Sequence, residues 1–116
     1  MAVVGTDPVL MLSGPIPATR KALYQAKLKP EDINLAEINE AFSSVVGAWR
    51  KEFPEINYEN VNANGGSIAI GHPLGATGAR LMTNLIHEMK RNKLKYGLQA
   101  ICEGGGTANA TIVELV

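Results

Sequence analysis

Apolar positions in the first half of the chain predict an alternation of strands and helices. A short apolar run over 2–4 is ended by a turn signal, as expected for the end of a buried strand. The amphipathic pattern over 18–28 predicts a short helix. Residues 33–38 predict a second strand, and apolar residues then recur at helical spacing over 41–49. Asn39 is therefore expected at a strand-to-helix junction.

The second half of the chain is organised around a long glycine-rich stretch. We expect residues 62–78 to form a loop, with Thr77 capping a helix over 79–89. The apolar run 98–102 predicts a short strand, and 108–116 predicts a strand rich in Ile, Val and Thr. Glycines between these two runs mark a turn, so the strands are expected to pair as a hairpin.

The order of these elements, with one further short strand before the third helix, places the chain in the α/β class. We expect a mixed, mostly parallel sheet with an antiparallel edge strand and packed helices. A chain of 116 residues fits one domain, 1–116, and its 46% apolar content can supply a core.

Charge and cysteine content narrow the classes of partner. Eleven basic residues balance eleven acidic ones, so no global field favours nucleic acid or an anionic membrane. The basic stretch 90–95 is expected to be a solvated helix end, where positive charge meets the helix dipole favourably. No apolar run approaches the roughly 20 residues of a membrane span. The single cysteine and the lack of a leader pattern predict an intracellular protein, in the cytoplasm or an organelle matrix.

Three potentially reactive side chains follow the ends of successive strand regions: Asn39, His72 and Cys102. In open α/β sheets, ligands bind outside the carboxyl ends of strands. An amide, an imidazole and a thiol in one crevice would suit proton transfer and oxyanion stabilisation. Each residue also has a structural explanation, because asparagine caps helices, histidine bonds the backbone and a lone cysteine packs as a small hydrophobe. Spacing alone leaves both explanations open.

Sequence motifs around these residues favour the chemical explanation. Asn-Glu-Ala-Phe occupies 39–42, the run 62–78 contains Gly-His-Pro-Leu-Gly-Ala-Thr-Gly, and Cys-Glu-Gly-Gly-Gly occupies 102–106. Together with Gly-Pro-Ile-Pro-Ala at 14–18, these ordered motifs resemble the C-terminal signatures of the thiolase family. The resemblance extends from about residue 3 to the end. Condensing enzymes of fatty-acid or polyketide synthesis share the general fold, but the Cys-Glu-Gly motif favours thiolase.

The resemblance implies a reaction on acyl-CoA thioesters, either Claisen condensation or thiolysis of a 3-ketoacyl-CoA, through an acyl-enzyme. It implies that His72 takes the proton of a nucleophilic cysteine and, with a water held by Asn39, stabilises the enolate oxygen. Cys102 would move the proton at the α-carbon. The Gly104 backbone N–H would supply one donor of the oxyanion hole that faces the acyl-enzyme carbonyl.

The resemblance also suggests how the substrate is held. Met11 and Phe42 resemble positions that line the pantetheine tunnel, with core packing as the structural alternative. Coenzyme A thioesters enter as substrates, and neither a metal nor a further cofactor is implied. His87 lies off the apolar face of its helix and is expected to be a surface residue.

The chain departs from the family at the nucleophile. In thiolases the nucleophilic cysteine lies in an N-terminal half, whereas this sequence contains only Cys102. We therefore expect a C-terminal domain that is inactive alone, needs the N-terminal half in cis or in trans, and forms homo-oligomers through uncovered apolar surface. The alternative is a non-enzymatic remnant or accessory subunit that binds a partner chain or acyl-CoA. Acyl-chain length and reaction direction stay open.

Overall fold

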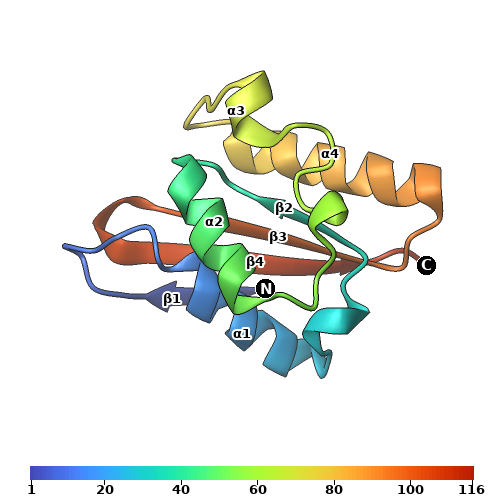
Figure 1. Ribbon diagram of the computed structural model, residues 1–116, viewed down its shortest axis with the longest axis horizontal. Coiled ribbons are helices and arrows are strands. Elements are labelled where there is room, and N and C mark those ends of the chain that lie inside the picture. The colour runs from blue at the N-terminus through green and yellow to red at the C-terminus, as the bar shows by residue number, and fades with distance from the viewer.

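The computed structural model describes residues 1–116, and its centre is a four-stranded sheet in the order β1–β4–β3–β2 (Figure 1). The strands are β1 (Ala2–Gly5), β2 (Leu35–Ile38), β3 (Tyr96–Cys102) and β4 (Thr107–Glu114). β1 and β4 come from opposite ends of the chain and lie side by side, blue beside red in Figure 1. The edge strands are therefore β1 and β2, with the β3–β4 hairpin between them.

Strand pairing confirms the α/β class and the mixed sheet, and corrects the balance of strand directions. β3 and β4 form the expected antiparallel hairpin, and β1 is antiparallel to β4. Only β2 and β3 run parallel, with Leu35 opposite Gly97 and Ile38 opposite Ala100. The expectation of mostly parallel strands is therefore wrong, because the first strand of the chain pairs with the last one.

Helices α1 (Pro15–Ala26) and α2 (Ser43–Glu52) cover one face of the sheet. Trp49 of α2 is fully buried there, and its indole N–H donates to the Thr19 hydroxyl of α1 at 2.9 Å. The large ring can be buried because its polar atom finds a partner. The buried residues of this main core are Ala2, Ala18, Ala22, Leu23, Ile33, Ala36, Ile38, Trp49, Phe53, Ile56, Val61, Leu98, Ala100, Ala108 and Ala110.

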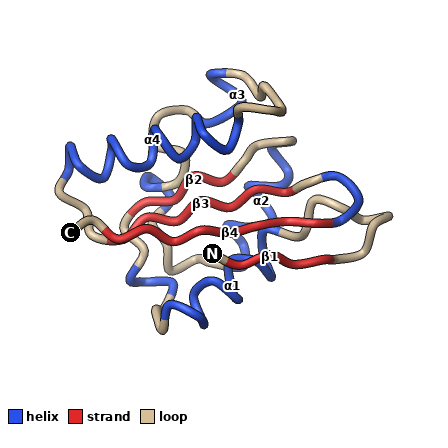
Figure 2. Tube along the Cα trace, turned by 180° about the vertical axis from the view of Figure 1, so that it is seen from behind, coloured by secondary structure: helices blue, strands red, loops and turns tan.

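Helix α4 (Thr77–Asn92) covers the opposite face, and Figures 1 and 2 show it from two sides. Leu85 and Met89, one helical turn apart, pack with Leu35 of β2 in a second, smaller core. The remaining helical segments are short: α3 (Gly66–Ile70) and the 3₁₀ turns Pro30–Asp32, Tyr58–Asn60 and Gly104–Gly106. None of the helices has both the length and the apolar character that a membrane crossing requires.

Several predicted boundaries differ from the structure. α1 begins at Pro15 instead of residue 18, because proline fits the first turn of a helix. α2 begins at Ser43, so residues 41 and 42 precede it. The expected short strand is only a single bridge between Ala36 and Val61.

The glycine-rich stretch 62–78 is not a continuous loop, because α3 forms within it. Thr77 is the first residue of α4 and does not cap it; the cap position belongs to Ala76, which provides no side-chain hydrogen bond. The Thr77 hydroxyl instead donates to the carbonyl of Pro73 at 2.9 Å. The residue type suggested a cap, whose hydroxyl oxygen would accept from a backbone N–H, but here the hydroxyl donates to a carbonyl.

Two glycine substitutions test how closely α1 packs on the sheet. At Gly14, which precedes α1, a Cβ atom would lie 2.5 Å from the Cβ of Ala108 on β4, and neither atom can rotate away. We expect Gly14→Ala to lower the free energy of unfolding by about 1–3 kcal/mol. Gly47, exposed in α2, has open space around it, so Gly47→Ala should raise stability by about 0.5–1 kcal/mol.

Urea unfolding followed by the fluorescence of Trp49, the single tryptophan, measures both variants. Equal changes in the two variants would contradict the close contact at Gly14.

Candidate active site

A cavity of about 410 Å³ opens at the carboxyl end of β3. Its wall combines residues that follow β1, residues that follow β2, the loop before α4 and the end of β3. The structure thus brings together three residues that the motifs single out: His72, Cys102 and Gly104. Apolar side chains form much of the remaining wall. The lining residues are Leu12, Ala41, His72, Leu74, Thr77, Gly78, Ile101, Cys102, Glu103 and Gly104.

The imidazole of His72 is held by the hydroxyl of Thr77. Nδ1 of His72 lies 2.6 Å from the Thr77 hydroxyl oxygen, and that hydroxyl donates its only hydrogen to the Pro73 carbonyl at 2.9 Å. Both contacts of the Thr77 oxygen are satisfied when the proton of the neutral ring is on Nδ1 and the hydroxyl accepts from it. Nε2 keeps a free lone pair, so His72 can take a proton there.

The loop that carries His72 is anchored on both sides despite its exposure. The Gly71 N–H donates to the Ser67 carbonyl at 2.8 Å, and the Arg80 guanidinium donates to the Gly71 carbonyl at 3.1 Å and also to the carbonyl of Ile70. The N–H of Thr77 donates to Pro73, which closes the turn at the start of α4. The imidazole is thus positioned by short-range backbone contacts.

Cys102 ends β3 and is buried at the cavity wall. Burial raises the pKa of its thiol above the ordinary value, and the Glu103 carboxylate acts in the same direction. Hydrogen bonding to its own backbone and to the Asn39 side chain opposes this rise in pKa. Since the net shift is upward, the thiol is protonated at neutral pH and can serve as an acid.

Asn39 is fully buried behind the wall and does not line the cavity. Its backbone N–H donates to the Ala100 carbonyl at 2.9 Å, and its side-chain Oδ1 accepts from the Ser67 hydroxyl at 2.9 Å. No partner within ordinary hydrogen-bond distance occupies its Nδ2. The three predicted residues therefore meet in part: His72 and Cys102 share the wall, and Asn39 lies in the interior behind it.

Gly104 opens the turn after β3 and faces open space. A Cβ atom built at Gly104 would meet no protein atom within 4 Å, so packing does not require glycine there. Gly105 and Gly106 differ, because their φ angles of 73° and 82° favour glycine. The space that a side chain would fill at Gly104 is therefore open.

Met11 and Phe42 are not core residues, because 36% of Met11 and 63% of Phe42 is exposed. Neither lines the cavity with His72. Met11 lies in a neighbouring depression of about 340 Å³, and the two hollows share Leu12. His87 is exposed on α4 outside the cavity, as predicted.

The segment before α3 is fastened to β2 by Asn62. Its side-chain Oδ1 accepts from the Ile38 N–H at 2.7 Å, and its Nδ2 donates to the Ile38 carbonyl at 2.9 Å. The next glycine pair reverses the chain, and Gly66, with φ 59°, approaches the Glu40 carboxylate. That carboxylate accepts from the Ile68 N–H at 2.7 Å. These bonds place Ser67 against Asn39.

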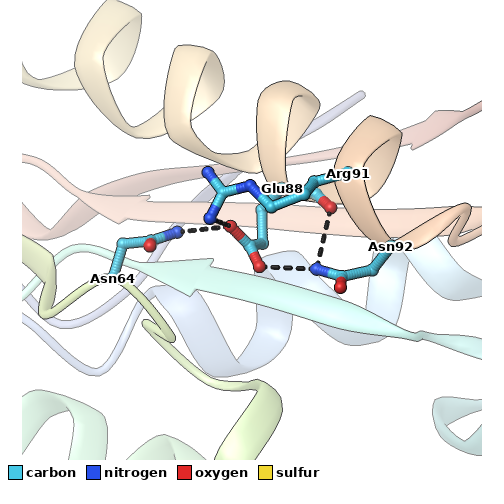
Figure 3. Close-up of polar contacts among 4 residues, drawn as sticks. All are labelled: Asn64, Glu88, Arg91 and Asn92. Carbon is cyan, nitrogen blue, oxygen red and sulfur yellow. Dashed lines mark hydrogen bonds and ion pairs between the residues drawn. The ribbon is translucent and has the colours of Figure 1, made fainter.

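A polar cluster on α4 holds the same segment from the other side (Figure 3). The Asn64 amide donates to Glu88 at 3.0 Å, and the Asn92 amide donates to the same carboxylate at 2.5 Å. Arg91 pairs with it at 3.1 Å. The hydrogen bond from Asn64 is the largest cause that lowers the pKa of the Glu88 carboxyl, and Asn92 and Arg91 add to it. Glu88 therefore stays ionised and links the segment to α4.

Sequence reasoning missed three features of this region: the residues Ser67 and Glu37, and the contact of Thr77 with His72. Glu37 lies on β2, two residues before Asn39, with 1% of its surface exposed. Its Oε2 has no hydrogen-bond partner. Burial, followed by the charges of Glu40 and Glu88, raises its pKa to about 7. The signal available in the sequence was a single charged residue inside an otherwise apolar strand.

Comparison with known proteins agrees with this geometry. The family described as "Thiolase, C-terminal domain" matches residues 1–115. The chain belongs to the thiolase family and corresponds to its C-terminal domain.

Individual relatives carry thiolase names. The chain is 59% identical over 108 residues to the steroid 3-ketoacyl-CoA thiolase FadA6 of Mycobacterium tuberculosis, covering 93% of this chain and 26% of that protein. It is 47% identical over 113 residues to the acetyl-CoA acetyltransferase of Cupriavidus necator, covering 97% and 28%. It is 47% identical over 116 residues to the 3-ketoacyl-CoA thiolase of Vibrio parahaemolyticus, covering 98% and 30%. The chain thus spans less than a third of each of these relatives.

The buried carboxyl of Glu37 predicts a pH dependence of folding stability. Its folded-state pKa of about 7 lies above the ordinary 4.5, so folding favours the protonated form. The stability that this proton contributes is complete below about pH 4.5 and is lost as the pH rises to about 7, by up to about 3 kcal/mol. Glu37→Gln, a neutral isostere, should therefore be more stable than wild type at pH 7 and nearly equal to it at pH 4.5.

Urea unfolding of both proteins at several pH values measures this difference, with the exposed Glu55→Gln as the matched control. A constant gap between wild type and Glu37→Gln across the range would show that Glu37 does not titrate in this way.

Proposed function

We propose that this chain is the C-terminal catalytic half of an acyl-CoA acyltransferase of the thiolase type. Its reaction is Claisen condensation of acyl-CoA thioesters or thiolysis of a 3-ketoacyl-CoA. The observation that carries the proposal is the shared wall of His72, with a free Nε2, and Cys102, with a protonated thiol. The names of the relatives, acetyl-CoA acetyltransferase and 3-ketoacyl-CoA thiolase, support the substrate class.

His72 acts first as a base. Its Nε2 takes the proton of a nucleophilic cysteine that lies outside this chain, which leaves a thiolate to attack the thioester carbonyl. The Nε2–H formed in that step then donates to the enolate oxygen of the second thioester. Asn39 adds a water-mediated donor to that oxygen, and its unpartnered Nδ2 supports this role.

Cys102 carries the proton of the α-carbon. In thiolysis its thiol gives the proton to the enolate carbon as the acetyl-CoA unit leaves, and in condensation its thiolate removes the proton from the same carbon. A raised thiol pKa suits the first of these steps. The N–H of Gly104, a residue of the cavity wall, donates to the carbonyl oxygen of the acyl-enzyme.

The partner of this half is a nucleophile-bearing N-terminal half, in cis or in trans. Because Cys102 is the single cysteine, the chain alone forms no acyl-enzyme and is inactive. Met11 and Phe42 contact the pantetheine arm, and the reaction of coenzyme A thioesters needs no further cofactor.

We propose that the protein forms homo-oligomers, and we assign no role to nucleic acid or membrane. The alternative function is an accessory subunit that binds a partner chain or acyl-CoA without catalysis.

A chimera separates the two functions. In it, residues 1–116 replace the matching segment of the Cupriavidus necator acetyl-CoA acetyltransferase, and coenzyme A-dependent cleavage of acetoacetyl-CoA is followed. We expect turnover, and we expect His72→Ala and Cys102→Ser each to lower kcat by at least about 100-fold, the usual contribution of a general acid or base. His87→Ala, on the exposed side of α4, should leave kcat unchanged.

A folded chimera of native assembly state that turns over nothing would favour the accessory subunit. A chimera whose activity survives both substitutions would refute the assigned residues.

The tautomer of His72 yields a separate expectation. Thr77→Val keeps the shape of the side chain but removes the acceptor for Nδ1–H, so the ring is no longer held with Nε2 free. We expect kcat of the chimera to fall by about tenfold, the value of one hydrogen bond, and Thr77→Ser to stay near wild type. Unchanged kcat in Thr77→Val would show that Thr77 does not orient the base.

A further inference from the structure

The carboxylate of Glu103 makes hydrogen bonds that the mechanism above does not use. Glu103 follows Cys102 in the cavity wall and begins the turn that joins β3 to β4. Its Oε1 accepts from the side-chain amide of Asn109 at 2.6 Å, and its Oε2 accepts from the Thr107 hydroxyl at 3.1 Å. That hydroxyl shares its one hydrogen with the Gly104 carbonyl, 3.2 Å away. The Glu103 side chain thus ties the start of the turn to β4.

The backbone of Glu103 determines the direction of the N–H that follows it, that of Gly104. Glu103 is extended, with φ −126° and ψ 160°, and its own N–H donates to the Thr107 carbonyl on β4 at 2.9 Å. Successive peptide groups of an extended chain point in opposite directions, so the Gly104 N–H is directed away from β4. β2 is the neighbour of β3 on that side, and Ala41, which follows β2, is part of the cavity wall. This direction agrees with the oxyanion role of Gly104.

The turn cannot fix this direction by itself, because residues 104–106 are all glycine. Glycine loses more conformational freedom on folding than any other residue, so such a turn is ordered only when other groups hold it. At the far end of the turn, the N–H and the hydroxyl of Thr6 donate to the Gly106 carbonyl at 2.7 and 2.8 Å. Glu103 is the corresponding anchor at the near end, and hydrogen bonds to its carboxylate are stronger than bonds between neutral groups.

We propose that Glu103 is a positioning residue, whose carboxylate clamps the start of the turn to β4 and so holds the Gly104 N–H toward the cavity as the oxyanion donor. Glu103 acts through Gly104 and forms no bond with the substrate. The inference deepens the proposed function, because it rests on the oxyanion role of Gly104. It also explains a carboxylate in the wall of a site where negative charge develops, since the site uses its hydrogen bonds and not its charge.

Two measurements test the proposal, and the first requires no turnover. It is the order parameter of the Gly104 N–H in the 116-residue chain labelled with ¹⁵N-glycine, which gives twelve signals. The signal of Gly104 is the one that disappears in Gly104→Ala. The second measurement is the steady-state kinetics of the chimera described above, with kcat and KM determined separately. The variants are Glu103→Ala, Glu103→Gln, Asn109→Ala, the double alanine variant and Glu55→Ala, a control at an exposed glutamate.

We expect the order parameter of Gly104 to fall from about 0.85 in the wild type to below about 0.6 in Glu103→Ala, the range of a flexible backbone. In the chimera, Glu103→Ala should lower kcat by about tenfold, part of the roughly 100-fold that loss of an oxyanion donor costs. KM should change by less than about twofold, because the oxyanion forms only in the transition state and the intermediate.

The other variants separate the hydrogen bonds from the charge. Glu103→Gln keeps the shape and the acceptor for Asn109, so its order parameter and kcat should stay near the wild-type values. Asn109→Ala keeps the charge and should lower both quantities in part. The double variant should match Glu103→Ala, because the two side chains act as one unit. Glu55→Ala should leave both quantities unchanged.

A rigid Gly104 in Glu103→Ala overturns the proposal, and so does an unchanged kcat in that variant. If Glu103→Gln loses as much kcat as Glu103→Ala, the charge acts instead of the hydrogen bonds, and the clamp is wrong. A KM that rises as far as kcat falls would show a general loss of the binding site, which also contradicts the clamp. If Glu103→Ala does not fold, Asn109→Ala decides the question, and an unmoved order parameter of Gly104 in that variant overturns the proposal.

The clamp and the proposed function fail separately. A mobile Gly104 in Glu103→Ala together with an inactive wild-type chimera supports the clamp and refutes the acyltransferase. An active chimera whose kcat does not respond to Glu103→Ala does the reverse.

Discussion

The site depends on the pair of hydrogen bonds between the side chain of Asn62 and the backbone of Ile38. Two buried hydrogen bonds, of 2.7 and 2.9 Å, join the side chain of one segment to both backbone groups at the end of β2. In a low-dielectric interior such bonds are strong, and an unpaired amide or peptide group there is costly. The segment from Gly65 to the start of α4 begins at this point, and Glu40 and Arg80 hold its later parts, the helix turn that faces Asn39 and the loop that presents His72.

The site therefore has two kinds of support. The sheet supplies Asn39 and Cys102 from the ends of neighbouring parallel strands, which are deep in the structure and shielded from water. The segment that Asn62 fastens supplies His72, which is exposed and oriented through Thr77. A proton-transfer thiol benefits from burial, because burial keeps it protonated. A base that must meet a group from another part of the protein benefits from lying at the surface.

Short sequence patterns predicted correctly the elements that depend on residues close together in the chain. The hairpin of β3 and β4 followed from two apolar runs separated by glycines, and helix α2, which buries Trp49, followed from apolar residues at helical spacing. The motifs identified His72, Cys102 and Gly104, which the structure places on one wall.

The pairing of β1 with β4 was not predictable in this way, because it joins the two ends of the chain. Helix α3 begins at Gly66, directly after Gly65, although glycines favour loops, and contacts with β2 and Glu40 explain why it forms. The partner of a hydroxyl is equally invisible in the sequence, so the contacts of Ser67 and Thr77 required the structure.

The bonds of Asn62 also protect the sheet from other chains. β2 is an edge strand, and an edge strand exposes N–H and C=O groups that can pair with a strand of another molecule. Asn62 occupies both backbone groups of Ile38 with its side chain and the Ala36 carbonyl with its own N–H. The residue that shapes the active-site segment thus closes this edge against intermolecular β-pairing, so a chain that lost this asparagine would be prone to aggregate as well as misaligned at its site.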